Sequence, residues 1–249
     1  MRDGMRMCCA SIALAALLAA CTMIPGANSV DYAAVVAASD RSDADRQTDQ
    51  RRDPRQLLAF TTVQRRMRVL DMGAGGGYST ELLARAVGPS GVVYAQDSPV
   101  GGERAKERFE ARMRDPAMKN VVRLAREFDD PVPSDVRNLD LVTFFFFYHD
   151  TTYMPVDRAK MNRALFDALK PGGILVIADH SAKPGDGIGV AKSLHRIEES
   201  ALRREIEAAG FRLVAEGQFL RHAEDPRDAI VFRPKVPVDE FVLRFEKPR

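Results

Sequence analysis

From residue 54 onward, short apolar runs of strand length alternate with longer amphipathic segments. The runs predict strands over residues 68–72, 92–96, 121–126, 139–146 and 174–179. Between the runs, apolar residues recur at spacings of three and four, which predicts helices over residues 79–87, 103–114, 158–169 and 195–209. This alternation is typical of a three-layer α/β domain, in which crossover helices cover both faces of a mostly parallel sheet.

Two further apolar runs follow. Residues 211–220 and 240–246 predict a pair of strands, separated by a proline-rich excursion. With these two, the predicted sheet has seven strands. The whole sheet belongs to one predicted domain over residues 53–249.

The first twenty residues have the order of a secretory signal. Arg2 and Arg6 precede an apolar run over residues 8–20, and this run ends in small residues. The run is shorter than the roughly 20 apolar residues that a transmembrane helix needs. The sequence therefore predicts a signal peptide over residues 1–20.

The tetrapeptide Leu18-Ala19-Ala20-Cys21 resembles the lipobox of bacterial lipoproteins, in which the cysteine becomes the lipidated first residue of the mature chain. This resemblance implies an exported, periplasmic protein that is attached to a bacterial membrane through Cys21. Translation from Met23 would instead remove the signal and leave a cytoplasmic protein.

Residues 21–52 are rich in Ala, Ser, Asp, Arg and Gln and poor in apolar residues, so they predict a tether or linker with a helix near its end. The expected state is a tethered monomer. The three cysteines Cys8, Cys9 and Cys21 all precede the predicted domain. That domain therefore has no internal disulfide, no thiol nucleophile and no cysteine-based metal site.

The composition of the 249 residues, 45% hydrophobic and 29% charged, is that of an ordinary globular protein. It excludes collagen, a coiled coil and wholesale disorder. The formal net charge is +2, and no stretch concentrates basic residues. Nucleic acid is therefore not an expected partner.

Four glycines within five residues lie between the first predicted strand and its helix: Gly73, Gly75, Gly76 and Gly77. Glycine permits positive φ and has no Cβ, so this glycine loop can approach a ligand closely at the edge of the sheet. A dinucleotide-binding loop, G-x-G-x-x-G, would need a third glycine where Tyr78 stands.

Asp71 precedes the first of these glycines by two residues. A carboxylate is unfavourable beside a pyrophosphate and favourable beside a cationic ammonium group. The residues therefore favour a cofactor that carries an amino acid. An NAD(P)-dependent oxidoreductase is the least favoured function.

Several motifs in a fixed order resemble those of the class I S-adenosylmethionine-dependent methyltransferases. The first motif of that family, acid-x-Gly-x-Gly-x-Gly, is matched by Asp71, Gly73, Gly75 and Gly77. Two structural motifs follow, LKPGG over residues 169–173 and AGF over residues 209–211. The sequence also resembles a group of exported bacterial proteins described as predicted methyltransferases, which share His-Asp after the fourth strand and an end similar to FVLRFEKP.

The resemblance implies S-adenosyl-L-methionine as the cofactor and a Rossmann-like sheet with an antiparallel carboxyl-terminal edge strand. Asp97 stands where the family's acid takes both ribose hydroxyls, and a carboxylate can accept two donors. Asp129 or Asp130 stands where an acid meets the adenine amino group, and the sequence does not choose between them. The predicted cofactor site also includes Tyr78.

Polar residues that follow the fourth and fifth strands are the candidates for chemistry, because open α/β sheets bind ligands at the carboxyl ends of their strands. These residues include His149, Asp150 and His180, and His195 is expected near the same edge. We hypothesise that His149, as a neutral imidazole, removes the proton of an oxygen or nitrogen acceptor. The alternative is that His149 and Asp150 form a helix-start cap.

A divalent metal held by Asp150, Asp179, His149 and His180 is a further alternative. No spacing motif supports it, so the sequence predicts no metal site. The leading function is methyl transfer to a small-molecule or lipid-like acceptor. A catalytically degenerate binding module of the same fold in the periplasm is the second hypothesis, since fold alone does not guarantee chemistry.

Overall fold

The structure is a computed structural model that describes residue 1, residues 28–232 and residues 234–249. The signal peptide beyond Met1, the lipidation site Cys21 and the alternative start Met23 lie outside the described residues. They stay predictions. In the part of the chain that is described, no helix has the length and apolar content needed to cross a membrane.

The strands of the described residues form one seven-stranded sheet in the order β3-β2-β1-β4-β5-β7-β6. Strands β1 to β5 are parallel, and β7 is antiparallel to both β5 and β6. This confirms the predicted fold class, with β7 second from the edge and β6 outermost. The strands are β1 Arg68–Met72, β2 Val92–Asp97, β3 Val121–Ala125, β4 Leu139–Phe145, β5 Leu169–His180, β6 Arg212–Gly217 and β7 Glu240–Glu246.

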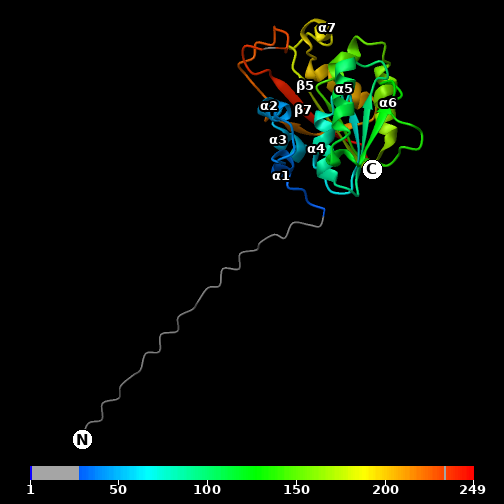
Figure 1. The fold of residues 1–249 in the computed structure, drawn as a ribbon. Helices are drawn as coiled ribbons and strands as arrows, with labels where there is room; N and C mark the ends of the chain where they lie inside the picture. Colours follow the sequence, from blue (N-terminus) through cyan, green and yellow to red (C-terminus); the bar gives the residue numbers. More distant parts are fainter. Residues whose placement is uncertain (2–27, 233) are drawn as a thin grey trace.

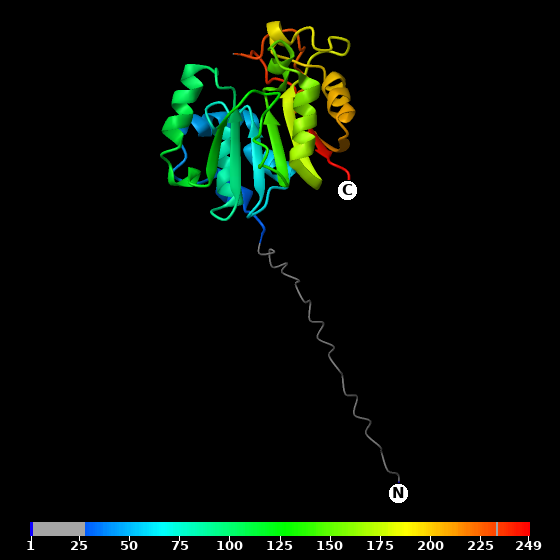
Figure 2. The ribbon, with the colours of Figure 1, turned by 90° about the vertical axis from the view of Figure 1, so that its right-hand side faces the viewer.

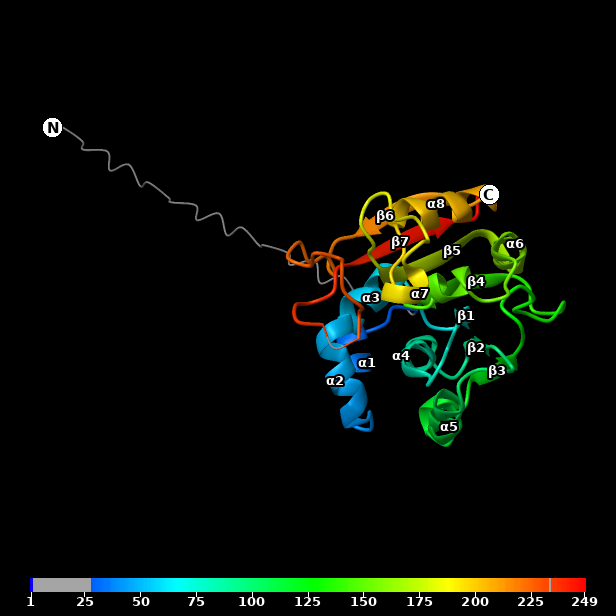
Figure 3. The same ribbon diagram turned by 90° about the horizontal axis from the view of Figure 1, so that it is seen from above.

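Helices cover both faces of the sheet, so the domain has three layers (Figures 1, 2 and 3). α4 (Tyr78–Val87) and α5 (Glu103–Arg112) lie on one face, and α6 (Arg158–Ala168) and α8 (Glu199–Ala208) lie on the other. Each face has its own apolar core. Neighbouring residues of β1 show the division, because Val69 packs into the core beside α4 and Leu70 into the core beside α6 and α8.

The helix predicted near the end of the tether is present, but the described part of this segment packs against the domain and is not a free linker. Two helices of the segment, α1 (Tyr32–Val36) and α2 (Asp43–Arg52), lie against the α4 side of the domain together with α3 (Pro54–Thr61), the first helix of the predicted domain (Figure 1). Side chains cap each amino terminus. Asp31 accepts from the N–H of Ala34, Ser42 from that of Asp45 and Asp53 from that of Gln56.

Charged contacts hold α2 in place. The Arg112 guanidinium of α5 donates to both carboxylate oxygens of Asp45, at 2.7 and 2.9 Å. The Tyr78 hydroxyl donates to Asp49 at 2.7 Å, and Arg41 also donates to Asp49, at 2.6 and 2.8 Å. This polar docking explains why the apolar pattern did not reveal that the helix packs against the domain.

One predicted helix has a different start. The sequence predicted a helix over residues 195–209, but His195 ends the short helix α7 (Ala191–Leu194), and α8 begins only at Glu199. His195 has φ of 53°, a left-handed conformation that ends a helix. Two short 3₁₀ helices, η1 (Pro116–Met118) and η2 (Tyr148–Thr152), complete the elements of the described residues.

Candidate functional site

The glycine loop follows β1, next to β4, where the order of the strands along the sheet reverses. This is the position at which open α/β sheets bind ligands. Gly73, Gly75 and Gly77 all have positive φ, at 62°, 53° and 81°. At Gly73 a Cβ would also lie 3.1 Å from the Phe147 ring. Glycine is therefore required there both by the backbone and by the space.

Asp71 lies beneath the loop and is not in contact with a ligand space, whereas the sequence had predicted such a contact. The side chain is buried, and its carboxylate accepts hydrogen bonds from the hydroxyls of Ser79, Thr80 and Thr143 at 2.9, 2.6 and 2.8 Å. Burial raises its pKa, although these hydrogen bonds oppose the shift. Asp71 therefore joins β1, β4 and the first turn of α4, and it is not open to an ammonium group of a ligand.

Asp97 ends β2 beside the loop. One carboxylate oxygen accepts from the N–H of Gly75 at 3.1 Å and the other from the N–H of Ser98 at 2.8 Å. Burial raises its pKa above the ordinary value, and the two backbone hydrogen bonds oppose this. Each oxygen keeps a lone pair, so the carboxylate can still accept two donors.

Asp129 and Asp130 follow β3. The Asp130 carboxylate pairs with the guanidinium of Arg126, and Asp129 lies 3.5 Å from the Lys160 ammonium. Among the described residues, neither carboxylate is hydrogen-bonded to the glycine loop. Asp130 is exposed and Asp129 is half-buried.

A cleft of about 980 Å³ opens beside the loop. One wall is the loop itself, with Tyr78 and Ser79 at the start of α4. The opposite wall is α2 together with the residues just before it. The ends of β4 and α5 close the cleft, and its lining includes Asp45, Arg52, Gly75, Tyr78, Arg112 and Phe147.

Tyr78 lies in this cleft, as predicted, but its hydroxyl is bound to Asp49 of α2. Burial and the neighbouring Asp49 raise its pKa well above the usual value. The ring lies 5.3 Å from the guanidinium carbon of Arg52. Tyr78 therefore connects the two walls of the cleft.

Arg52, the last residue of α2, was not identified from the sequence. Its guanidinium lies 4.5 Å from the centre of the Phe146 ring. Its Nε is buried and has no hydrogen-bond partner among the described residues. Burial, together with the adjacent Arg51, lowers the pKa of this side chain to about 10. An unpartnered guanidinium N–H in a cleft is a donor that suits an anionic group.

A second pocket, of about 420 Å³, adjoins the first and contains three of the four histidines. This confirms that His149, His180 and His195 gather at one edge of the sheet. We call it the histidine pocket. It is lined by Arg51, Arg52, Phe146, His149, Asp150, His180, His195, Val231, Phe232 and Pro234.

His149 is buried and held from two sides. Its Nδ1 lies 2.7 Å from Asp179 Oδ1, and its backbone N–H donates to Asp179 Oδ2 at 2.9 Å. Burial alone would lower its pKa, but the carboxylates of Asp179 and Asp150 raise it to about 10. The two carboxylates therefore favour the protonated imidazole, whereas the predicted role as a proton acceptor needs the neutral form.

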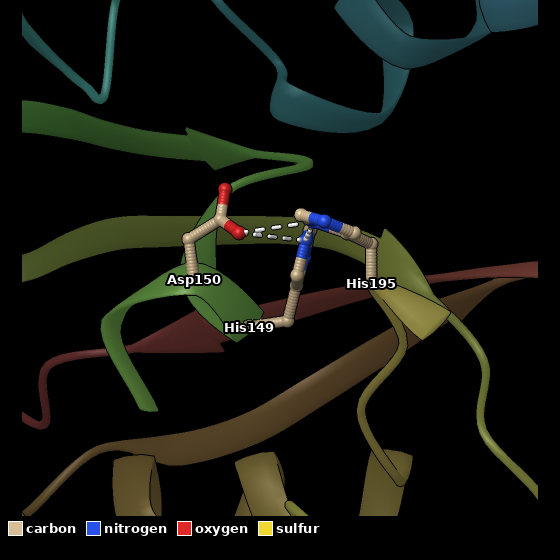
Figure 4. A group of neighbouring side chains, drawn as sticks. All are labelled: His149, Asp150 and His195. Carbon is tan, nitrogen blue, oxygen red and sulfur yellow. Dashed lines mark hydrogen bonds and ion pairs between the residues drawn. The ribbon is translucent and has the colours of Figure 1, made fainter. Parts of the chain in front are cut away.

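His149, Asp150 and His195 point toward one another from η2 and from the end of α7 (Figure 4). His149 Nε2 lies 3.2 Å from His195 Nδ1 and 3.2 Å from Asp150 Oδ1. His195 Nδ1 lies 3.2 Å from the same Asp150 oxygen. Burial would raise the pKa of Asp150, but the hydrogen bond and charge of His149 hold it below the usual value.

His180 ends β5 and lies deeper in the histidine pocket. Its Nδ1 is 2.9 Å from Glu240 Oε1 of β7, and both side chains are almost fully buried. Its ring packs against that of Phe146, with ring centres 5.3 Å apart. His180 therefore belongs to the pocket wall.

Two further residues at this edge were also missed. The hydroxyl of Tyr153, in the turn after η2, donates to Asp150 and lies 3.5 Å from His195 Nδ1. Phe232, in the proline-rich excursion, is exposed, and its ring centre lies 4.7 Å from that of His195. The three-residue spacing of Asp150 and Tyr153 was a usable signal. Phe232 gave none, because its partner is distant in sequence.

The fold and the glycine loop together define the class of protein. A parallel sheet with a glycine-rich turn after β1 and an acid at the end of β2 makes a Rossmann-like domain with a ligand site at the carboxyl edge. A family model described as a methyltransferase domain matches residues 44–216, which is more than half of the chain. The chain belongs to this methyltransferase-domain family.

Curated relatives share about half their length with this chain. The ubiquinone/menaquinone biosynthesis C-methyltransferase UbiE of Proteus mirabilis is 30% identical over 127 residues, which are 51% of this chain and 48% of that protein. The protein-L-isoaspartate O-methyltransferase of Ignicoccus hospitalis is 30% identical over 122 residues, which are 49% of this chain and 51% of that protein.

Solved structures share the fold at lower identity. A SAM-dependent methyltransferase from Aquifex aeolicus has a TM-score of 0.58 and 22% identity, over 78% of this chain and 89% of that one. The [4+2]-cyclase SpnF also has a TM-score of 0.58, with 18% identity over 82% of this chain and 81% of its own. The same fold thus carries more than one chemistry, and the activity has to be argued from the site.

Proposed function

We propose that this protein binds S-adenosyl-L-methionine in the cleft beside the glycine loop and transfers its methyl group to a small-molecule or lipid-like acceptor in the histidine pocket. The observation that carries the proposal is the junction of the two spaces. Arg51, Arg52 and Phe146 line both of them. A cofactor on one side and an acceptor on the other would therefore meet at this junction.

Residues of the first cleft, together with Asp97 behind the glycine loop, fit the ribose and the methionyl carboxylate of this cofactor. Asp97 has free lone pairs for ribose hydroxyls, and the glycine loop lets backbone approach the ligand closely. The unpartnered Nε of Arg52 suits the carboxylate of the methionyl group. When bound, the cofactor supplies an electrophilic methyl group on a sulfonium.

The side chains at the junction orient the reactants and exclude water. The aromatic side chains of Phe146 and Phe147 line the cleft. Phe147 also stacks on the buried Phe128, with ring centres 5.1 Å apart. Phe146 has φ of 58°, a conformation that costs a bulky residue energy and that fixes its ring between Arg52 and His180. Holding the two reactants in line supplies much of the acceleration of a displacement.

The histidine pocket supports an acceptor that is small and partly apolar. Its volume of about 420 Å³ suits a small molecule or one end of a larger one. Phe146, Val231, Phe232 and Pro234 supply apolar surface, and the histidines and Asp150 supply polar groups. The name of the Proteus relative, a ubiquinone/menaquinone biosynthesis C-methyltransferase, is compatible with this class of acceptor.

Isothermal titration of the purified full chain tests the cofactor assignment. We expect saturable binding of S-adenosylmethionine and of its demethylated product, and none of NAD. Arg52→Met should weaken binding about tenfold or more, because a hydrogen bond to a charged group contributes about 1.5–3 kcal/mol. Arg55→Met, on the exposed side of α3, is the matched control and should bind as the wild type does. Equal binding by both variants, or preferential binding of NAD, would contradict the proposal.

We also propose that Cys21 carries a lipid that anchors the protein outside the cytoplasm. The support is the sequence alone, in the charge, apolar run and tetrapeptide that precede Cys21. Mass spectrometry of the amino terminus of the native protein tests it. A lipidated Cys21 is expected, whereas a chain that starts at Met23 would refute the anchor.

A further inference from the structure

We propose that His149, Asp150 and His195 form a binding site for one divalent transition-metal ion. The sequence gave no reason to expect it, because His149 and His195 are 46 positions apart and no ligand-spacing motif joins them. The set also differs from the four residues weighed from the sequence. His195 takes the place of His180, and Asp179 does not face the centre of the cluster.

The three donor atoms have the spacing of a metal site. His149 Nε2, His195 Nδ1 and Asp150 Oδ1 form a triangle with sides of 3.2 Å. A tetrahedral ion with bonds of about 2.0–2.1 Å holds its ligand atoms about 3.3 Å apart, and an octahedral ion with similar bonds holds neighbouring ligand atoms about 2.9 Å apart. An ion on the axis of this triangle can therefore reach all three atoms without rearrangement of the backbone.

Hydrogen-bonded partners behind the donor atoms support the same interpretation. Asp179 accepts from Nδ1 of His149 at 2.7 Å, which leaves Nε2 directed at the cluster. The Tyr153 hydroxyl donates to the Asp150 carboxylate. A carboxylate behind a histidine and a donor behind a ligating carboxylate are the usual supports of metal ligands in proteins.

Charge and backbone conformation also fit the site. Two carboxylates, Asp150 and Asp179, lie within hydrogen-bond distance of the imidazoles. An ion of charge +2 that displaces the proton from Nε2 of His149 balances these two charges. His195 adopts a left-handed φ of 53°, which is costly for a side chain with a Cβ and which brings its ring to the cluster. All three ligands line the histidine pocket, so further coordination positions can be taken by water or a small molecule.

Two imidazoles and one carboxylate suit zinc, iron(II) and neighbouring ions of the first transition row. We choose Co²⁺ as the probe, because it follows the same ligand preferences and is visible by its d–d absorption. The competing description is a hydrogen-bonded cluster with a shared proton and no affinity for metal. Direct metal binding separates the two descriptions.

The experiment is a titration of the chelator-treated full chain with Co²⁺, followed by absorption and by calorimetry, and then competition with Zn²⁺. We expect saturable binding by the wild type. His195→Gln should weaken it strongly, and Tyr153→Phe should weaken it about 10- to 100-fold, as the loss of an outer hydrogen bond does at metal sites. The matched control is His222→Gln, which removes the one histidine outside the cluster and the pocket.

The variants also exclude binding by the thiols of Cys8, Cys9 and Cys21, which are the same in every protein compared. If His195→Gln does not fold, Asp150→Asn tests the same site. Absence of saturable Co²⁺ binding by the wild type, or equal binding by the His195 and His222 variants, would overturn the proposal. The titration contains no S-adenosylmethionine, so its result is separate from that of the cofactor titration.

Discussion

The cleft beside the glycine loop has two walls that are held in different ways. The loop wall continues β1 and α4, whose apolar side chains are buried in the core on that face of the sheet. The wall formed by α2 buries few apolar groups and is held by Arg112, Asp45 and Tyr78 through charged and polar contacts. One wall therefore depends on apolar burial, and the other on the pairing of partly buried charges.

This difference has a consequence for stability. Apolar burial does not itself titrate with pH, whereas an ion pair loses its contribution when one partner is removed or neutralised. We therefore expect α2 to detach from the domain under conditions that leave the sheet intact.

The largest expected effect comes from Arg112→Met, which leaves the carboxylates of Asp45 and Glu81 without their shared cation. Loss of one partner of a buried ion pair costs about 3 kcal/mol. Limited proteolysis should then cut within residues 31–53, while the spectrum of the folded sheet is retained. Arg104→Met, on the exposed side of α5, is the control and should leave this segment protected.

Asp97→Asn should have the next largest effect, and on the other wall. The amide cannot offer the same acceptors to ribose hydroxyls, so the affinity for S-adenosylmethionine should fall by about 1.5–3 kcal/mol, or roughly 10- to 150-fold. Isothermal titration calorimetry measures this affinity. Asp129→Asn is the comparison, and an equal loss there would show that Asp129 also meets the cofactor.

Gly73→Ala tests whether the glycine loop has room for a side chain at this position. A side chain at φ of 62° costs about 1–2 kcal/mol, and the added Cβ would lie 3.1 Å from the Phe147 ring. We expect a lower melting temperature and weaker cofactor binding. Gly102→Ala should change neither, because a Cβ at that position meets no atom within 4 Å.

Acidification should have the smallest effect on stability, and it should loosen the α2 wall before the sheet. Burial alone would raise the pKa of Asp45, but Arg112 overrides it and holds the pKa below the ordinary value. A lowered pKa means that the stabilisation is present above the ordinary value of about 4 and is lost as the pH falls below it. The protection of residues 43–52 against hydrogen exchange, relative to the intrinsic rate at each pH, should therefore fall below pH 4 before that of β1 does. A simultaneous loss of protection in both would contradict this order.

The sheet could be predicted from the sequence because its strands are buried on both faces and appear as continuous apolar runs, as in β4. The α2 wall could not be predicted, because its contacts are between charged residues that are distant in sequence, such as Asp45 and Arg112. A helix near the end of this segment was predicted, and Ser42 and Asp53 cap α2 and α3, but the low apolar content of the segment gave no sign that α2 packs against the domain.

The site was predicted in part. The glycines and Asp97 lie where the motif order indicated, and three histidines gather at one edge. Asp71 was assigned to a ligand although it is buried among three hydroxyls, because a motif gives the position of a residue and not the direction of its side chain. The start of the last predicted helix was wrong for a similar reason, since nothing local marks the left-handed turn at His195.

The central claim is that the two walls enclose one cofactor site. Hydrogen exchange of the full chain with and without the demethylated cofactor, S-adenosylhomocysteine, tests it most directly. We predict that residues 73–79 of the loop wall and residues 43–52 of α2 both become slower to exchange on binding. Slowing of the loop alone would place the cofactor outside the α2 wall, and no slowing at either wall would contradict the assignment of this cleft.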